Sequence, residues 1–499
     1  MTAVSDVSET SAQPGASDVL DTPAAGVAAI RGGALRIAGY VAGVAVSVAS
    51  SALLLRHLGV AQTGDYVTVM SLVALIGGVT ETGLAAIGVR ELSTLAPSRS
   101  QSFFRSLAGL RLVFIVGGVL VAVGFAALSG YSSTLVFGTG LAGGGYVLIT
   151  TQTTYTLPLL AQLRLNWVTA VEALRALGTA LAIAALALAG APLLPFWAAT
   201  IPAGILATAM AALLIRRSMP LLPAFDAAIW RPILRRTLPY SMAAAVGAVY
   251  FRLAILIMSH VASSQQTGYY GASFRIIEVL FILPQLIVGS TLPIFARAAR
   301  DDRQRLNYAL GRTFDVCLLL GLAVGLLLIS GASFIIAVIA GPKFGPAASV
   351  LRIQGFALIA TFIGALLGYA LLSLGRYREV LLINLVVLAL SGAFTGVLAS
   401  RFGALGAASA TTVVELMYTG MLAFAVARTG TRPQISLSRV ARAWVSALLG
   451  ALALVPPDLP NIARPVLAMT IYCGCLLLLR AVPSELLDQV PRLRRSPAS

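Results

Sequence analysis

Long apolar stretches separated by short polar loops run through residues 33–483 of the chain. Each stretch is close to the roughly 20 residues that a helix needs to cross a bilayer. The pattern therefore predicts an all-α integral membrane protein with about 14 transmembrane helices. The predicted spans are 33–56, 65–89, 109–129, 134–161, 166–189, 193–215, 238–261, 268–295, 314–340, 347–374, 379–400, 404–427, 440–456 and 464–482.

Arginine is unevenly distributed among the loops between these spans. The loops on one side, together with both ends of the chain, hold 27 arginines. The opposite side holds four basic residues, Arg56, Lys343, Arg401 and Arg464. Because cytoplasmic loops carry an excess of lysine and arginine, the Arg-rich side and both termini are predicted to be cytoplasmic.

The composition supports this class of protein and narrows its partners. Hydrophobic residues make up 58% of the chain, charged residues make up 11%, and the mean hydropathy is +0.92, whereas about a quarter of the residues in soluble domains are charged. The net charge of +17 would suggest nucleic acid in a soluble protein, but topology and anionic lipid headgroups account for it here. No nucleic-acid partner is expected. The cysteine spacing predicts no metal site, and the sequence contains no phosphate-binding loop, so no cofactor is expected either.

A short sequence repeat divides the membrane portion in two. Residues 62–66 read Gln-Thr-Gly-Asp-Tyr, and residues 266–270 read Gln-Thr-Gly-Tyr-Tyr, at an offset of 204. Two six-span halves related by a parallel duplication predict a substrate site between two lobes. The predicted organisation is a disordered cytoplasmic tail (1–30), an N-lobe (31–217), a C-lobe (218–430), two further helices (431–483) and a cytoplasmic tail (484–499).

Several short motifs occur along the chain in the order and at the spacing that are typical of one transporter family. They are Leu58-Gly59, Gly64-Asp65-Tyr66, Ser71-Leu72, Thr82-Gly83-Leu84, Arg90-Glu91-Leu92, Phe344-Gly345-Pro346-Ala347-Ala348, Val350-Leu351-Arg352-Ile353, Leu371-Leu372-Ser373-Leu374-Gly375-Arg376 and Phe402-Gly403-Ala404-Leu405-Gly406-Ala407-Ala408. On these motifs the chain resembles the Wzx-type flippases of polysaccharides and lipid-linked oligosaccharides. Those flippases belong to the multidrug/oligosaccharidyl-lipid/polysaccharide exporter superfamily. The resemblance extends over about residues 30–480.

The resemblance implies two six-helix lobes around a central cavity, two additional C-terminal helices, and a cavity wall made by the first, second, seventh and eighth helices. It also implies that an undecaprenyl-pyrophosphate-linked glycan moves from the inner to the outer leaflet of a bacterial plasma membrane. Polysaccharide polymerase or glycosyltransferase machinery would then be a functional partner. The related lipid II flippases also have fourteen helices, but the chain lacks the Arg-Asp pair of their first helix, because Ile37 follows Arg36.

Ionisable residues inside the predicted spans are candidate functional residues, because a charge near the bilayer centre costs about 2.5–3.5 kcal/mol. Arg252 lies in span seven, and Arg275 and Glu278 share one face of span eight. Guanidinium groups bind phosphates in a bidentate manner and stay charged. Arg252 and Arg275 are therefore predicted to anchor the pyrophosphate. The alternative is that Arg275 and Glu278 only neutralise each other.

Three more residues complete the predicted substrate-binding set: Glu172 and Arg175 in span five, and Glu81 in span two. The i,i+3 spacing of Glu172 and Arg175 favours a structural ion pair. Glu81 and Glu415 are candidates for proton- or sodium-coupling carboxylates. Glu415 lies in a stripe of threonines and tyrosines, which is more typical of hydrogen bonds between helices.

These observations predict a flippase for lipid-linked glycans that is not an enzyme. An ion-coupled multidrug antiporter of the same superfamily and a lipid II flippase remain as alternatives. The antiporters usually have twelve helices and acidic residues in the cavity, in contrast to the arginines here. An enzyme that polymerises or ligates lipid-linked glycans would need a large external loop, and the predicted outer loops are short. Pro284 and Pro293 predict a bending element in span eight.

Overall fold

The computed structural model describes residues 23–81, 83–454, 456 and 459–482, without the side chains of residues 23–41, 81, 97, 236–244 and 301. The described residues form helices joined by short connections and contain no β-strand. Ten of these helices are long and apolar enough to cross a membrane, and two shorter ones are also apolar. Two of the long helices double back at a glycine, so the arrangement agrees with the fourteen predicted spans. The all-α membrane class is confirmed.

The helices follow the predicted order. The first half contains α1 (Pro23–Glu81), α2 (Leu84–Thr94), α3 (Pro97–Leu128), α4 (Ser133–Ala161), α5 (Leu165–Leu188), α6 (Leu193–Ala198) and α7 (Thr200–Ile215). The second half contains α8 (Ala227–Val261), α9 (Ser264–Leu280), α10 (Ile282–Asp301), α11 (Arg303–Ile339), η2 (Pro342–Phe344), α12 (Ala347–Ser373) and α13 (Tyr377–Arg428). The chain then forms α14 (Leu437–Ala451), η3 (Leu452–Leu454) and α15 (Ala463–Leu478). Helix α1 begins inside the segment expected to be a tail, and residues 1–22 and 483–499 of the expected tails lie outside the described residues.

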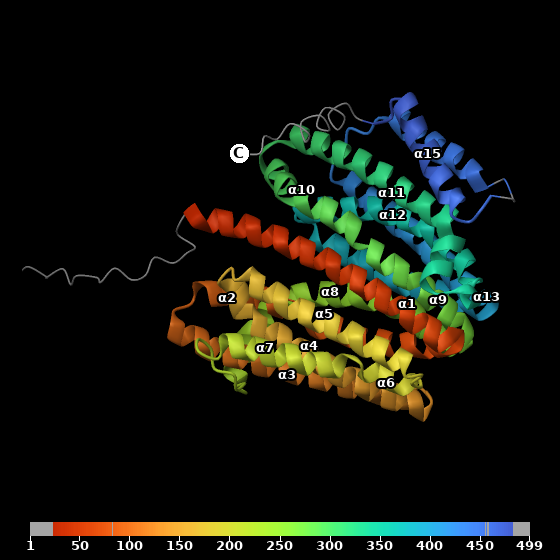
Figure 1. Ribbon diagram of the computed structural model, residues 1–499. Helices are drawn as coiled ribbons and strands as arrows, with labels where there is room; N and C mark the ends of the chain where they lie inside the picture. The colour runs from red at the N-terminus through yellow and green to blue at the C-terminus, as the bar shows by residue number, and fades with distance from the viewer. Residues whose placement is uncertain (1–22, 82, 455, 457–458, 483–499) are drawn as a thin grey trace, which may run out of the picture.

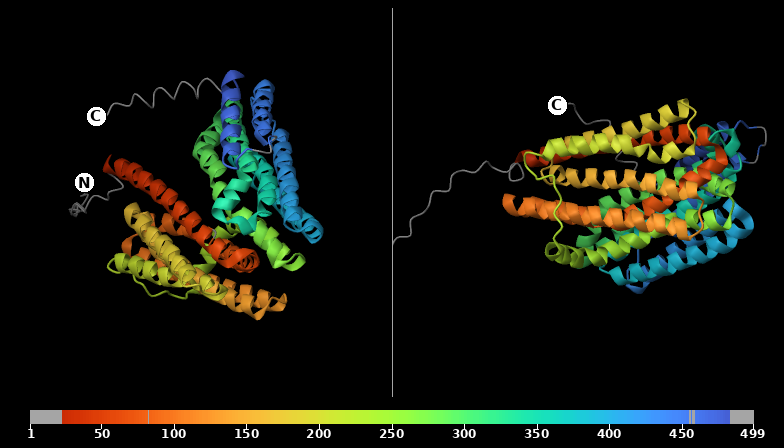
Figure 2. Two further views of the ribbon diagram at one scale, coloured as in Figure 1. Left: turned by 45° about the vertical axis from the view of Figure 1, so that its right-hand side comes forward. Right: turned by 90° about the horizontal axis from the view of Figure 1, so that it is seen from below.

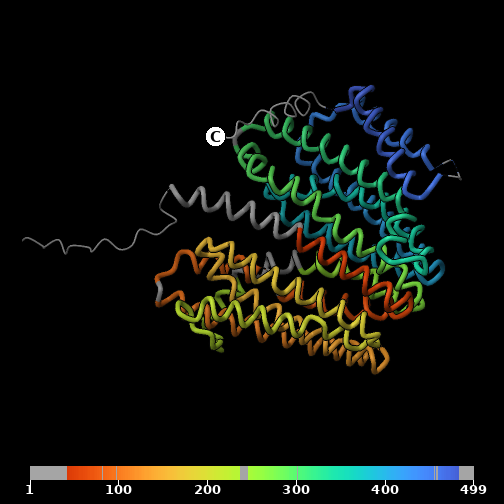
Figure 3. Tube along the Cα trace, in the orientation of Figure 1, coloured from red at the N-terminus to blue at the C-terminus, as the bar shows by residue number. Residues whose placement is uncertain are grey.

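The two halves form separate groups of helices (Figure 1). Helix α1 packs on α5 of its own half and on α9 of the other, while α8 packs on α1 and on α13. Helices α14 and α15 pack on each other and on α11. The left view in Figure 2 shows the same separation, and the trace in Figure 3 shows the halves meeting at one end and diverging toward the other. Each half has its own apolar core, with Phe196 and Trp197 in the first and Phe344 and Phe362 in the second.

The helices contain a turn or break with a local cause at three places. Gly59 (φ 71°) separates the two arms of α1, and Gly403 (φ 57°) separates those of α13. Only glycine adopts such a positive φ without a steric cost. Span eight is divided between Leu280 and Ile282. Pro284 has no N–H to donate to the carbonyl of Leu280, four residues earlier, which accounts for a break where a bending element was predicted.

The two halves approach each other closely where the sequence repeat lies. A Cβ atom added to Gly64 of α1 would lie 1.9 Å from the carbonyl oxygen of Ser264 in α9. A Cβ atom added to Gly268 of α9 would lie 2.0 Å from the carbonyl oxygen of Val60 in α1. The hydroxyl of Ser264 also donates to Oδ1 of Asp65 at 2.8 Å. The two repeated glycines thus occupy equivalent places on either side of one helix crossing.

Arg56 adds a polar contact near this crossing. Its guanidinium donates to the carbonyl oxygens of Ala337, at 3.4 Å, and of Val338. Both carbonyls lie in the last turn of α11, where the helix dipole favours a cation. The halves are therefore held together at the end that the sequence predicts to face away from the cytoplasm.

Candidate functional site

A cavity of about 290 Å³ lies between the two halves. Its wall includes both arms of α1 together with α8 and α9, which are the first, second, seventh and eighth predicted spans. Arg252, Arg275 and Glu278 all line this cavity. The structure therefore brings together the three residues that the sequence singled out most strongly.

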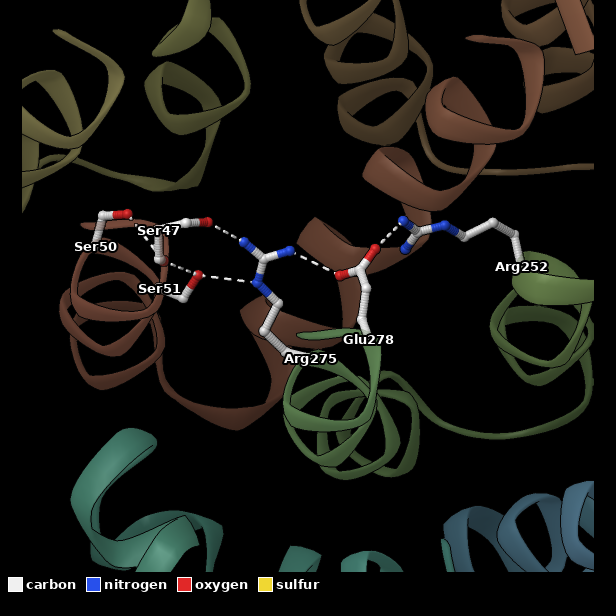
Figure 4. A network of polar contacts seen from close by, with 6 residues as sticks. All are labelled: Ser47, Ser50, Ser51, Arg252, Arg275 and Glu278. Atoms are coloured by element: carbon white, nitrogen blue, oxygen red, sulfur yellow. Dashed lines mark hydrogen bonds and ion pairs between the residues drawn. The ribbon is translucent and has the colours of Figure 1, made fainter. Parts of the chain in front are cut away.

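These three side chains form one chain of polar contacts (Figure 4). Oε1 of Glu278 accepts from the guanidinium of Arg252, and Oε2 accepts from Nη1 of Arg275 at 2.7 Å. Each carboxylate oxygen is thus held by a different arginine. The side chains of Arg252 and Glu278 are each 22% exposed and that of Arg275 is 36% exposed, so the group is accessible from the cavity.

Arg275 also contacts the first half of the molecule. Its Nε donates to Oγ of Ser51 at 3.1 Å, and its Nη2 donates to Oγ of Ser47 (Figure 4). Because these serines are in α1 and Arg275 is in α9, the arginine links the two halves inside the membrane. The hydroxyls of Ser50 and Ser51 both donate to the carbonyl oxygen of Ser47, at 3.1 Å and 2.7 Å, but Ser50 has no hydrogen bond to Arg275 among the described contacts. The sequence analysis did not include Ser47 and Ser51; their i,i+4 spacing within an apolar span was the available signal.

The cluster has one more positive than negative formal charge. Arginines inside a membrane are usually paired, and Glu278 serves as the partner of both arginines here. Arg252 also lies over the ring of Phe274, 5.6 Å from its centroid, which further stabilises the cation. Arg275 and Glu278 do pair, as the alternative interpretation expected. Because Glu278 balances only one of the two arginines, one positive charge remains available to bind an anionic ligand.

Glu172 and Arg175 of α5 lie in a second cavity of about 400 Å³. This cavity adjoins the first, since Ser47 and Ser50 line both. Within the described part of the chain no ion pair joins Glu172 to Arg175, and Nε of Arg175 is buried without a hydrogen-bond partner. The structural pair favoured by the sequence spacing is therefore not formed.

The structure describes the surroundings of only one of the two candidate ion-coupling carboxylates, Glu81 and Glu415. Glu81 is the last residue of α1, beside the break before α2, and its side chain lies outside the described residues. Its role stays a prediction. Glu415 is 3% exposed in α13 and accepts from the hydroxyl of Tyr250 at 2.6 Å and from that of Thr361 at 3.3 Å. Only about 30 Å³ of space lies beside it, so its contacts agree with hydrogen bonding between helices.

Two further arginines lie inside the helix bundle. Arg111, which was counted among the arginines of the cytoplasmic side, is in α3, is 1% exposed, and donates to Oγ1 of Thr153 at 3.1 Å. Arg352, which was not among the predicted site residues, is in α12 and donates to Oγ of Ser333 at 2.9 Å. Both fall within predicted spans, so the signal for burial was present. Neither lines the cavity between the halves.

The chain is similar to known proteins in structure but not in sequence. No protein-family model matches the sequence, and no curated protein matches it in sequence. The structure is similar to that of the lipid II flippase MurJ in an inward closed conformation, with a TM-score of 0.74 and 13% identity over 89% of this chain and 99% of that chain. It is also similar to an inward-facing multidrug resistance MATE transporter of the MOP superfamily (TM-score 0.63, 13% identity, 78% of this chain and 96% of that chain). An outward-facing MATE structure gives a TM-score of 0.54, with 14% identity over 82% of this chain and 97% of that chain.

At such low identities these likenesses show the fold alone. The chain shares the fold of these solved membrane transporters.

Proposed function

We propose that the protein is a flippase for a polyprenyl-pyrophosphate-linked oligosaccharide or a related lipid-linked precursor of cell-envelope glycans. It would move this lipid from the inner to the outer leaflet of a bacterial cytoplasmic membrane by alternating access, with both termini cytoplasmic and no catalysed reaction. One observation carries the proposal: arginines from two helices meet on a single carboxylate in the cavity between the lobes.

The carboxylate of Glu278 indicates which ligands suit the site. Each of its oxygens accepts from a different guanidinium. A phosphoryl group offers oxygens with comparable geometry and more negative charge, and guanidinium groups bind it through charge-assisted hydrogen bonds. The polyprenyl chain of such a lipid can stay in the bilayer while the headgroup occupies the cavity. A lipid-linked pyrophosphate therefore fits both the charge and the location of the site.

Glu278 is an internal competitor for this ligand. An anion that takes both guanidinium groups releases Glu278 and draws Arg275 away from Ser47 and Ser51. Those hydrogen bonds join α9 of the second lobe to α1 of the first. Binding of the anion is thereby coupled to the loss of a contact between the lobes, and movement of the lobes is what alternating access requires.

The contact at the opposite end supports loading from the cytoplasm. The crossing of Gly64 and Gly268 and the contact of Arg56 with α11 hold the lobes together at the end predicted to be outer. The lobes diverge toward the other end (Figure 3). The higher TM-score with the inward-facing than with the outward-facing MATE structure agrees with this direction.

Two related functions have specific support. The likeness to the MurJ structure favours a lipid II flippase, whose substrate the same arginines would hold. The likeness to MATE transporters, together with the buried carboxylate of Glu415, favours an ion-coupled multidrug antiporter. The excess positive charge at Arg252 and Arg275 opposes a cationic drug, which makes the antiporter the weaker of the two.

Translocation of a fluorescent undecaprenyl-pyrophosphate oligosaccharide in proteoliposomes tests the proposal. The wild type is compared with Arg252→Ala and Arg275→Ala. Arg401→Ala, which removes an exposed arginine near the turn of α13, is the matched control. We expect the cavity variants to lose about 10- to 100-fold in rate, because hydrogen bonds to charged groups contribute about 1.5–3 kcal/mol. The control variant should match the wild type.

Each other outcome is informative. Unchanged translocation by folded Arg252→Ala and Arg275→Ala proteins would place the headgroup elsewhere. Absence of translocation by the wild type, with and without imposed proton or sodium gradients, would contradict the flippase function. Faster translocation of lipid II than of the oligosaccharide would favour the lipid II flippase, and gradient-driven extrusion of a cationic dye would favour the antiporter.

A further inference from the structure

A groove of about 660 Å³ lies between the two arms of α13. Leu382 of the first arm and Met417, Met421 and Phe424 of the second arm give it an apolar lining. Leu382 is 62% exposed and Phe424 is 65% exposed, so the groove is open on the outside of the helix bundle. Because α13 crosses the membrane, this surface faces lipid.

One end of the groove is polar. Arg376 forms an ion pair with Glu379 at 2.8 Å. Arg428 lies over the ring of Phe424, 5.9 Å from its centroid, and has no carboxylate partner within the part of the chain that the structure describes. The groove thus combines an apolar lining with one cation, Arg428, that has no carboxylate partner among the described residues and lies at the end of a transmembrane helix.

We propose that this groove binds an anionic phospholipid. The phosphodiester headgroup would lie on Arg428, and one acyl chain would lie along Met417, Met421 and Phe424. Glu379 neutralises Arg376, so the single remaining positive charge complements the single negative charge of a phosphodiester. Arg376 and Arg428 belong to the Arg-rich side, which is predicted to be cytoplasmic, and the cytoplasmic leaflet carries the anionic lipids. Methionine side chains adapt readily to an irregular apolar partner.

This site is separate from the one proposed for the translocated lipid. No residue lines both the α13 groove and the cavity that contains Arg252 and Arg275. The inference therefore does not depend on the proposed function. A polyprenyl chain or a second copy of the protein would be a different occupant, and the experiment below distinguishes them.

Two pairs of variants separate the groove from its surroundings. No atom lies within 4 Å of a Cβ added to Gly420, which lines the groove, so the side chain of Gly420→Leu would begin in open space and extend into the groove. Gly396 of the same helix is equally open but lies outside the groove, so Gly396→Leu is the control. Arg428→Gln removes the headgroup contact, and Arg401→Gln removes an exposed arginine near the turn of α13.

The readouts are native mass spectrometry of the detergent-purified protein and its thermal shift with added phosphatidylglycerol, phosphatidylcholine or glycerol 3-phosphate. We expect the wild type and both controls to retain phosphatidylglycerol. They should be stabilised more by phosphatidylglycerol than by the zwitterionic phosphatidylcholine, and not by glycerol 3-phosphate. Arg428→Gln should bind it about fivefold more weakly, since an arginine near anionic lipid contributes about 1 kcal/mol. Gly420→Leu should retain none.

Equal affinity of Arg428→Gln and the wild type for phosphatidylglycerol would overturn the proposal, as would equal stabilisation by phosphatidylcholine. Retention of a polyprenyl lipid in place of a phospholipid, or a dimer that Gly420→Leu dissociates, would assign the groove to another occupant.

Discussion

Glu278 and Glu415 are both carboxylates within membrane-spanning helices, but their surroundings are opposite. Glu278 lines the cavity between the lobes, is 22% exposed, and accepts from two arginines. Glu415 is 3% exposed and accepts from the neutral hydroxyls of Tyr250 and Thr361. The first carboxylate is balanced by two arginines at a cavity, and the second is enclosed by hydroxyl groups inside one lobe.

This difference distinguishes a contact that can be exchanged from one that holds helices together. A ligand anion can replace Glu278, because the arginines keep a charged partner when it does so and the cavity has room for it. Nothing comparable can replace Glu415 in a space of about 30 Å³. Its contacts join α8, α12 and α13 within the second lobe. Changes at Glu278 should therefore alter ligand binding, whereas changes around Glu415 should alter stability.

The largest expected effect comes from Glu278→Gln. Removing the competing negative charge while keeping the shape should raise the affinity of the cavity for geranyl pyrophosphate by about 10- to 100-fold, because hydrogen bonds to charged groups contribute about 1.5–3 kcal/mol. Isothermal titration calorimetry of the detergent-purified protein measures this affinity. Glu415→Gln is the matched control and should leave it within about twofold of the wild type.

A lower or unchanged affinity in Glu278→Gln would show that Glu278 orients the arginines for the ligand and does not compete with it. A rise in affinity in Glu415→Gln as large as in Glu278→Gln would contradict the division between the two carboxylates.

Much of the fold follows from the sequence, because long apolar segments have few alternatives in a bilayer. The spans and their order were predictable, and the two glycines of the repeat occupy equivalent places at one crossing. The break in span eight was foreseen from the prolines. The lobe contact made by Arg56 on α11 was not foreseen, since it depends on how helices far apart in sequence are placed.

The candidate site was predictable in part. Arg252, Arg275 and Glu278 could be selected because charges in a membrane need partners. Helical spacing gives the face that a residue occupies but not the rotation of that helix against its neighbours. For this reason the sequence could not show that Arg275 reaches Ser47, or that Glu172 and Arg175 line a cavity without pairing.

A smaller effect is expected from Tyr250→Phe, which removes the shorter hydrogen bond to Glu415. The variant should lower the free energy of unfolding by about 1 kcal/mol, within the range of hydrogen bonds between membrane helices, and leave pyrophosphate affinity unchanged. Thermal unfolding in detergent measures the first quantity. Tyr418→Phe is the control, because the Tyr418 hydroxyl has no hydrogen bond among the described contacts. Equal losses in both variants would mean that the bond to Glu415 contributes nothing specific.

The smallest effect is expected from the double variant Ser47→Ala, Ser51→Ala. It removes the two hydrogen bonds by which α1 restrains Arg275, and hydrogen bonds between membrane helices contribute on average only about 0.6 kcal/mol each. Pyrophosphate affinity should rise about two- to fivefold, and spin-label distances between the lobes should broaden. Ser50→Ala is the control, because Ser50 makes the same kind of bond to the helix backbone as Ser51 but, among the described contacts, none to Arg275. If affinity falls instead, as expected for Arg275→Ala, the serines aim the guanidinium at the ligand. The coupling between binding and lobe movement would then have to come from another contact.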